Sequence, residues 1–76
     1  MNHDMYDEIA SKITDKLINM CNNNKTDGKS LYELYSMLLD EKYYEYKSNI
    51  FPYIADQLAG KGYEIVSINN FSIKKY

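Results

Sequence analysis

The chain has 76 residues, of which 45% are hydrophobic and 26% charged, and its 9 lysines against 11 acidic residues give a formal net charge of −2. A chain of this length forms one domain, here residues 1–76, and buries only about 60% of the surface that its unfolded form exposes. Because neither sign of charge dominates, the net charge indicates neither a nucleic-acid mimic nor a polyanion-binding protein.

The composition also bears on location. Cys21 is the only cysteine, so no intrachain disulfide can form. No apolar run approaches the roughly 18 residues of a membrane span, and the first residues are acidic where a secretory signal has lysines before an apolar stretch. We therefore expect a cytoplasmic protein, of a cell or of an infected host. All nine basic residues are lysine, and Lys, Asn, Tyr and Ile have AT-rich codons, as is typical of AT-rich bacteria and their phages.

The first predicted helix covers about residues 5–22. Asp4 can cap it, and Asp7 and Glu8 follow in the first turn, where the helix dipole favours negative charge. Apolar residues then recur at three- and four-residue spacing, which predicts a buried face made of Ile9, Ile13, Leu17, Met20 and Cys21, with Tyr6 and Ala10 on the same side. Residues 22–29 supply asparagines and a glycine, which predicts a polar connection.

The second predicted helix covers residues 31–40. Ser30 and Glu33 form a capping box, since the serine hydroxyl can accept the amide of Glu33 and the glutamate can reach back to the amide of Ser30. The apolar face comprises Leu31, Leu34, Tyr35 and Leu38. The following residues 40–47 (DEKYYEYK) fit neither a helical nor an alternating pattern, and they either extend this helix or form a loop.

The third predicted helix covers residues 49–60. Ser48 or Asn49 can cap it, and Pro52 lies in the first turn, where a proline forfeits no intrahelical hydrogen bond. Its apolar stripe comprises Ile50, Phe51, Ile54, Ala55 and Leu58. Gly60 and Gly62 end the helix.

A two-stranded hairpin is predicted over residues 63–76, turning on Asn69 and Asn70. A two-residue turn pairs Ile68 with Phe71, Val66 with Ile73, and Glu64 with Lys75 on one face, which we expect to pack on the helices. The other face pairs Tyr63 with Tyr76, Ile65 with Lys74, and Ser67 with Ser72. The predicted fold class is therefore α+β, three helices followed by a C-terminal antiparallel hairpin.

The chain carries no catalytic or metal-binding signature. His3 is the only histidine and lies in a terminal segment that we expect to be frayed, so it cannot be held in place as a general base. Cys21 has no neighbouring histidine to activate it and is interpreted as a buried structural thiol. Zinc needs about four Cys or His ligands, and the chain has two. We therefore expect no enzyme, no cofactor and no metal.

The order of elements resembles that of the winged helix-turn-helix superfamily. The helices 5–22, 31–40 and 49–60 precede the hairpin 63–76 as the wing, and a first strand can lie at residues 27–29. The resemblance implies that the third helix enters the major groove of DNA. The residues that match its outward face are Asn49, Tyr53, Asp56, Gln57 and Lys61, with Lys74 on the wing; Asn and Gln can read adenine, whereas the chain lacks the arginine that most often reads guanine.

The competing interpretation is a protein-binding module. Exposed tyrosine with little net charge suits a protein surface better than a phosphate backbone, and tyrosine is enriched at interfaces, although a ring of tyrosines around the core edge is equally compatible with the sequence. The candidate partner-binding residues are Tyr43, Tyr44, Tyr46, Tyr53, Tyr63, Ile65 and Tyr76. The partner is expected to be a host protein bound by a phage or mobile-element accessory or inhibitor protein, and the strand edge ending at Tyr76 can also pair in a homodimer. Nucleic acid is the less favoured partner, and no membrane is expected.

Overall fold

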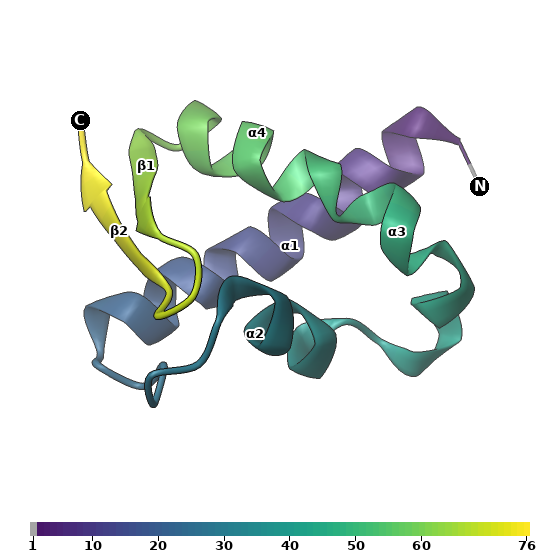
Figure 1. Cartoon of the computed structure of the whole chain (residues 1–76). Coiled ribbons are helices and arrows are strands. Elements are labelled where there is room, and N and C mark those ends of the chain that lie inside the picture. Colours follow the sequence, from purple (N-terminus) through teal and green to yellow (C-terminus); the bar gives the residue numbers. More distant parts are fainter. Residues whose placement is uncertain (1) are drawn as a thin grey trace.

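The computed structural model describes residues 2–76, and Figure 1 shows their arrangement. The elements in order are α1 (His3–Asn22), α2 (Leu31–Leu38), a 3-10 helix η1 (Glu41–Tyr46), α3 (Lys47–Ile50), α4 (Pro52–Gly60), β1 (Tyr63–Ser67) and β2 (Ser72–Lys75). Helices followed by an antiparallel hairpin were predicted, and this order is confirmed. The predicted count of three helices is wrong, because the third one is split in two.

The split of the third predicted helix occurs at Phe51, between α3 and α4. Pro52 has no amide hydrogen, so it cannot continue the hydrogen-bond ladder of α3. Phe51 keeps helical dihedral angles (φ −52, ψ −44), and its amide donates to the carbonyl of Lys47 over 3.1 Å. The backbone therefore continues in nearly helical form from α3 into α4, with one interruption in the ladder.

The start of α1 differs from the prediction because Asn2, rather than Asp4, caps it. The side chain of Asn2 accepts the amide of Met5 over 3.0 Å, so the helix begins at His3. The predicted end at residue 22 is confirmed. Ala10, Ile13 and Leu17 are buried as predicted, and Thr14 is buried with them. In Figure 1, α1 lies between α4 and α2, with the hairpin at one end and α3 at the other.

The predicted capping box of α2 is confirmed. Ser30 Oγ accepts the amide of Glu33, and Glu33 Oε1 accepts the amide of Ser30, each over 3.1 Å. The hydrogen bond that the backbone amide of Ser30 donates to the Glu33 carboxylate, with a smaller effect from the Ser30 side chain, lowers the pKa of that carboxyl. The helix ends at Leu38 rather than residue 40, because Leu39 turns to extended backbone (ψ 129).

The segment 40–47 is a separate 3-10 turn and not an extension of α2. The carboxylate of Asp40 accepts the amide of Lys42 over 3.1 Å and so caps η1. This turn leads the chain from the end of α2 back to α3, where it packs against α1 again.

The hairpin register is where the prediction is wrong. Ser67 pairs with Ser72 as predicted, but Ile65 pairs with Ile73, Glu64 with Lys74 and Tyr63 with Lys75, because a β-bulge lies between Ile65 and Ser67. A one-residue shift exchanges the two faces of a strand. Tyr63 and Ile65, predicted to lie on the outer face, therefore pack against the core, whereas Val66 and Ile68, predicted to be buried, are 60% and 56% exposed. Ile73 packs against the core as predicted. Phe71 is buried as predicted.

The predicted first strand at residues 27–29 is wrong, since the described residues contain only β1 and β2. Asp27 and Gly28 both have positive φ angles (53 and 70), which no strand accommodates. The connection nevertheless meets the hairpin turn. The carbonyl of Lys29 accepts the amide of Phe71 over 2.9 Å, and the amide of Leu31 donates to the carbonyl of Ile68 over 2.8 Å.

The largest fully buried side chain is that of Tyr35 in α2. Its ring packs on Phe51 with the ring centroids 5.0 Å apart, and its hydroxyl donates to the carbonyl of Lys47 over 2.6 Å. This contact joins α2 to the start of α3. Burial, with a smaller effect from the neighbouring Tyr32, raises the pKa of Tyr35 to about 12.

We predict that Tyr35→Phe lowers the free energy of unfolding by about 1 kcal/mol at neutral pH, because the buried hydrogen bond is lost while the ring is kept. Because the pKa of Tyr35 is raised in the folded state, its neutral phenol contributes fully to stability below the unfolded pKa near 10. This contribution is lost as the pH rises towards about 12. Urea unfolding followed from pH 9 to about 11.5 therefore shows a steeper fall in stability for the wild type than for Tyr35→Phe. Parallel falls would contradict the assignment.

Candidate functional site

The structure places the predicted partner-binding residues in two groups. Only Tyr44 and Tyr76 are exposed, to 49% and 77% of their surface. The other five are half-buried and pack against the core: Tyr43, Tyr46, Tyr53, Tyr63 and Ile65. The predicted tyrosine surface is therefore not a single exposed face.

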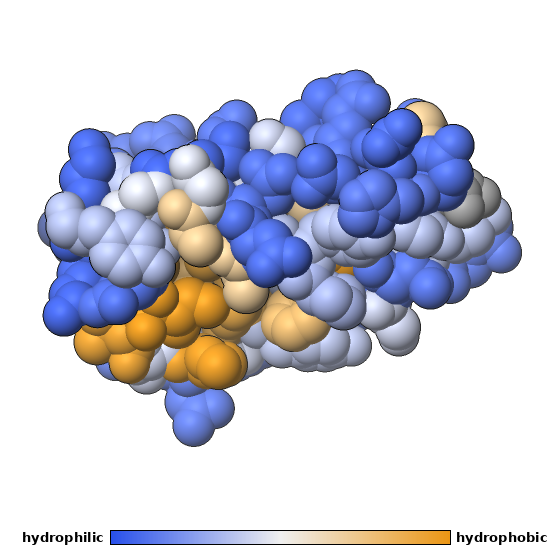
Figure 2. Space-filling view, turned by 90° about the horizontal axis from the view of Figure 1, so that it is seen from above, coloured by the Kyte–Doolittle hydropathy of each residue, from blue (hydrophilic) through white to orange (hydrophobic). Residues whose placement is uncertain are grey.

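The hairpin presents a different surface, which we call the outer hairpin face: Glu64, Val66, Ile68, Lys74 and Tyr76. Figure 2 shows strongly hydrophobic residues gathered at the end of the molecule that carries the hairpin. Val66 and Ile68 supply exposed aliphatic surface on this face, and the ammonium of Lys74 pairs with the carboxylate of Glu64 over 2.9 Å beside them. Sequence reasoning missed Val66 and Ile68, because the bulge that exposes them has no signature in the local residues.

A second exposed group surrounds Lys47, whose ammonium lies 4.9 Å from the ring centroid of Tyr32 and 5.6 Å from that of Tyr44. Both distances are within the range of cation–π attraction. The hydroxyl of Tyr44 also donates to the carbonyl of Ser36 over 3.3 Å. Tyr32 is 55% exposed and was not among the predicted residues. It packs on Phe51, and the two line a surface hollow of about 220 Å³ with Lys47, Ser48 and Pro52.

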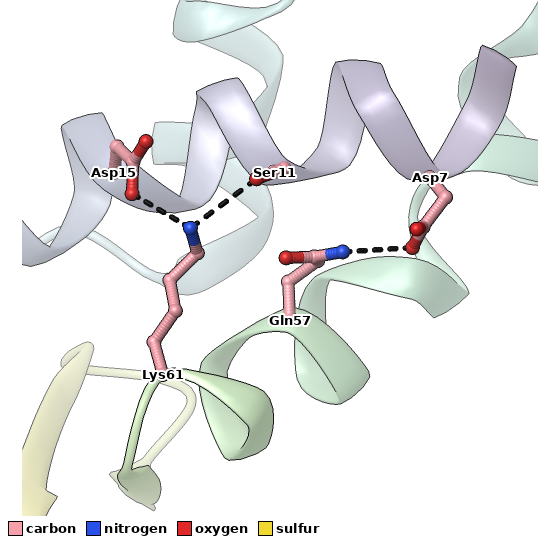
Figure 3. A network of polar contacts seen from close by, with 5 residues as sticks. All are labelled: Asp7, Ser11, Asp15, Gln57 and Lys61. Carbon is pink, nitrogen blue, oxygen red and sulfur yellow. Dashed lines mark hydrogen bonds and ion pairs between the residues drawn. The ribbon is translucent and has the colours of Figure 1, made fainter. Parts of the chain in front are cut away.

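Two residues of the predicted DNA-reading face, Gln57 and Lys61, are turned towards α1. Figure 3 shows Gln57 Nε2 donating to Asp7 over 2.8 Å, and Lys61 Nζ bound to Asp15 over 2.8 Å and to Ser11 over 3.2 Å. These contacts hold α4 against α1. Gln57 and Lys61 therefore do not form a free recognition surface, and the prediction that they face outward is wrong.

The remaining residues of the nucleic-acid set are scattered. The hydroxyl of Tyr53 hydrogen bonds to Nδ1 of His3, with the two ring centroids 5.1 Å apart, so the side chain of His3 in the first turn of α1 contacts α4. Asn49 and Asp56 are exposed and line a shallow hollow beside Tyr53, while Lys74 lies on the hairpin. No Cα atom of α2 comes within 8 Å of one in α4, so these two helices do not pack as a helix-turn-helix pair.

Neither the lone cysteine nor a group of metal ligands forms a site in the part of the chain that the structure describes. Cys21 is half-buried, and burial raises the pKa of its thiol. Within residues 2–76, no three His, Cys, Asp or Glu side chains come together in a group able to hold a metal ion. The helices of the same residues include none with the length and apolarity needed to cross a membrane.

Comparisons with protein-family models, with curated proteins and with solved structures gave no match to this chain.

We predict that the ion pair between Asp15 and Lys61 contributes less than about 1 kcal/mol, because Asp15 is largely exposed. A double-mutant cycle of Asp15→Asn and Lys61→Met, measured by urea unfolding, gives the coupling energy directly. The pair Lys12 and Glu8 on the exposed side of α1, 3.8 Å apart, is the matched control and is expected to couple less. A coupling above about 2 kcal/mol would mean that this network, rather than the apolar core, holds α4 in place.

Proposed function

We propose that this chain is a small non-enzymatic protein-binding module and that its outer hairpin face docks on the partner. The observation that carries the proposal is the exposure of Val66 and Ile68 to 60% and 56%. Val66 lies in β1 and Ile68 in the turn that follows it, and burying the part of each side chain that is still exposed contributes on the order of 1–2 kcal/mol. Strongly hydrophobic residues gather at this end of the molecule in Figure 2, and exposed apolar surface of this kind is typical of an interaction site.

The surroundings of the two aliphatic side chains support the same function. The ion pair of Glu64 with Lys74 and the exposed ring of Tyr76 supply the polar and aromatic groups that commonly border an interface. The backbone beneath them is anchored, because the hairpin turn is bonded to Lys29 and Leu31. A surface on an anchored hairpin binds with little loss of backbone entropy.

A homodimer paired through the β2 edge is disfavoured, so the proposed partner is a different protein. Lys75 is exposed on β2 and has no carboxylate within 4.0 Å among the described residues, so pairing two β2 edges about a twofold axis would bring the two Lys75 ammonium groups towards each other. Like charges on facing strands are destabilising, and lysine on an edge strand opposes edge-to-edge pairing. The chain is rich in Lys, Asn, Tyr and Ile, whose codons are AT-rich, as is typical of AT-rich bacteria and their phages. The proposed module is therefore an accessory or inhibitor protein of a phage or mobile element that acts on a host protein.

We predict that Val66→Asp combined with Ile68→Asp abolishes capture of the partner while leaving the fold intact. Both positions are exposed, so the charges are solvated in the free protein but buried without a counter-charge in the complex. The measurement is affinity capture from host extract with quantitative mass spectrometry, beside a thermal melt. Met37→Asp is the matched control, since Met37 is 61% exposed on α2.

A partner recovered equally by wild type and by the hairpin variant would contradict the assignment to this face. Sedimentation of the wild type at increasing concentration tests the homodimer. A dimer that the hairpin variant dissociates would replace the foreign partner with a second copy.

The alternative function is a winged-helix DNA-binding regulator, which the order of helices and hairpin favours. Its weakness is that Gln57 and Lys61 are engaged by α1. We predict no binding of a random-sequence duplex at about 50 mM salt, where phosphate contacts are strong. Fluorescence anisotropy at about 50 and 200 mM salt tests this. Micromolar binding that weakens steeply between the two would favour the DNA-binding regulator.

A further inference from the structure

A lysine-lined hollow lies on the side of the molecule formed by α1 and η1. It measures about 230 Å³, and eight residues line it, from α1, from the end of α2 and from η1. On α1 the lining residues Ile9, Lys12, Ile13 and Lys16 follow the three- and four-residue spacing that places side chains on one helix face. None of the eight belongs to the outer hairpin face.

The far wall is fixed by the cap of η1. Because Asp40 accepts the amide of Lys42, and the amide of Tyr43 donates to the carbonyl of Asp40 over 2.9 Å, the first turn of η1 has a defined conformation. This places the side chains of Lys42 and Tyr43 opposite α1, and the ammonium of Lys42 lies 5.1 Å from the Tyr43 ring centroid. The hollow is thus bounded on both sides by hydrogen-bonded backbone.

The hollow concentrates positive charge in an acidic protein. Three lysines (Lys12, Lys16 and Lys42) line it against the single carboxylate of Asp40, whereas the rest of the chain has six lysines against ten acids. Lys12 has a weak, exposed pair with Glu8 at 3.8 Å. Among the described residues, Lys16 and Lys42 have no carboxylate within 4.0 Å. Their charges are available to a ligand.

The floor of the hollow is apolar, formed by Ile9, Ile13 and Leu38 with the edge of Tyr43. Lysines that surround aliphatic surface extend their carbon chains along it and keep the ammonium at the rim. Such a hollow accepts a single large apolar side chain flanked by carboxylates. A nucleic acid fits less well, since its sugar-phosphate backbone has no aliphatic side chain to place on Ile9, Ile13 and Leu38.

We propose that this hollow binds an acidic segment of a partner protein that inserts one apolar side chain between its own carboxylates. The floor supplies affinity for the side chain, and the three ammonium groups select the acidic flanks. The site is independent of the outer hairpin face. It adds a second contact of defined chemistry to the proposed binding module.

The test is a titration of the ¹⁵N-labelled chain with the peptide acetyl-Glu-Asp-Phe-Asp-Glu-amide, followed by amide chemical shifts. We expect a dissociation constant of about 10–500 µM, as a short flexible peptide allows. The shifts should centre on residues 9–16 and 38–43. Lys16→Glu combined with Lys42→Glu should weaken binding at least about tenfold, because attraction of the acidic flanks becomes repulsion.

Three controls sharpen the result. Lys25→Glu with Lys75→Glu makes the same change in net charge away from the hollow and should retain binding. Lys16→Arg with Lys42→Arg keeps the charge and should also retain it. The hairpin variant Val66→Asp with Ile68→Asp should bind the peptide as the wild type does. The experiment therefore tests the hollow separately from the proposed docking of a partner on the outer hairpin face.

The proposal is overturned if no shifts arise at the hollow up to about 2 mM peptide, a concentration that detects even weak contacts. It is also overturned if the peptide with Phe replaced by Ser, or inorganic phosphate, binds equally well, since the hollow would then attract anions alone. Tighter binding of a single-stranded oligonucleotide of the same charge would assign the site to nucleic acid instead.

Discussion

Burial of one face of α1 is the constraint on which the rest of the structure depends. A chain of this length has apolar residues for one core only, and α2, α3, α4 and β2 all lie against the same helix. Ala10 and Leu17 are completely buried along it. Since each other element is short, its position is set by how it covers α1 rather than by its own stability. An isolated hairpin or an eight-residue helix would be marginal in water.

This constraint determines which polar groups remain free. On α4, the stripe that contains Ile54 and Leu58 covers α1, and the flanking Gln57 and Lys61 then come within reach of carboxylates on α1. Gln and Lys can contact bases or phosphates, but Gln57 and Lys61 here bind carboxylates on α1 instead. The same packing leaves the outer hairpin face and the hollow between α1 and η1 uncovered, and these are the two surfaces to which we assign binding.

The features predicted correctly from the sequence are those with local causes. The capping box of Ser30 and Glu33, the buried face of α1 and the end of α1 each depend on residues within a turn or two of one another. The error in the hairpin register has a long-range cause. The bulge at Val66 accompanies the packing of the hairpin on the helices and the hydrogen bond between its turn and Lys29. The residues of the hairpin alone do not predict it.

The candidate site was predicted poorly because the sequence does not distinguish a tyrosine that packs at the edge of the core from a tyrosine that binds a partner. The rings of Tyr46 and Tyr53 lie 6.2 and 6.1 Å from that of Tyr6, and together they cover the core edge. Tyr35 is wholly internal. A phenol can be half-buried with its hydroxyl in water, so tyrosine at the edge of a small core needs no partner. Exposed valine and isoleucine have no polar atom to keep in water, which makes Val66 and Ile68 the stronger indication of an interface.

The net charge gave no indication of a charged binding site, because a formal charge of −2 is a sum over the whole chain. The spacing of Lys12 and Lys16 on α1, and the turn that brings Lys42 opposite them, create a positive hollow that the total conceals. The outer hairpin face is nearly neutral, because Lys74 is paired with Glu64. Apolar burial gives affinity with little dependence on salt, whereas charges at a rim govern approach and orientation. A partner that meets both surfaces is therefore held mainly by the hairpin and oriented by the hollow, and salt acts on the second contact more than on the first.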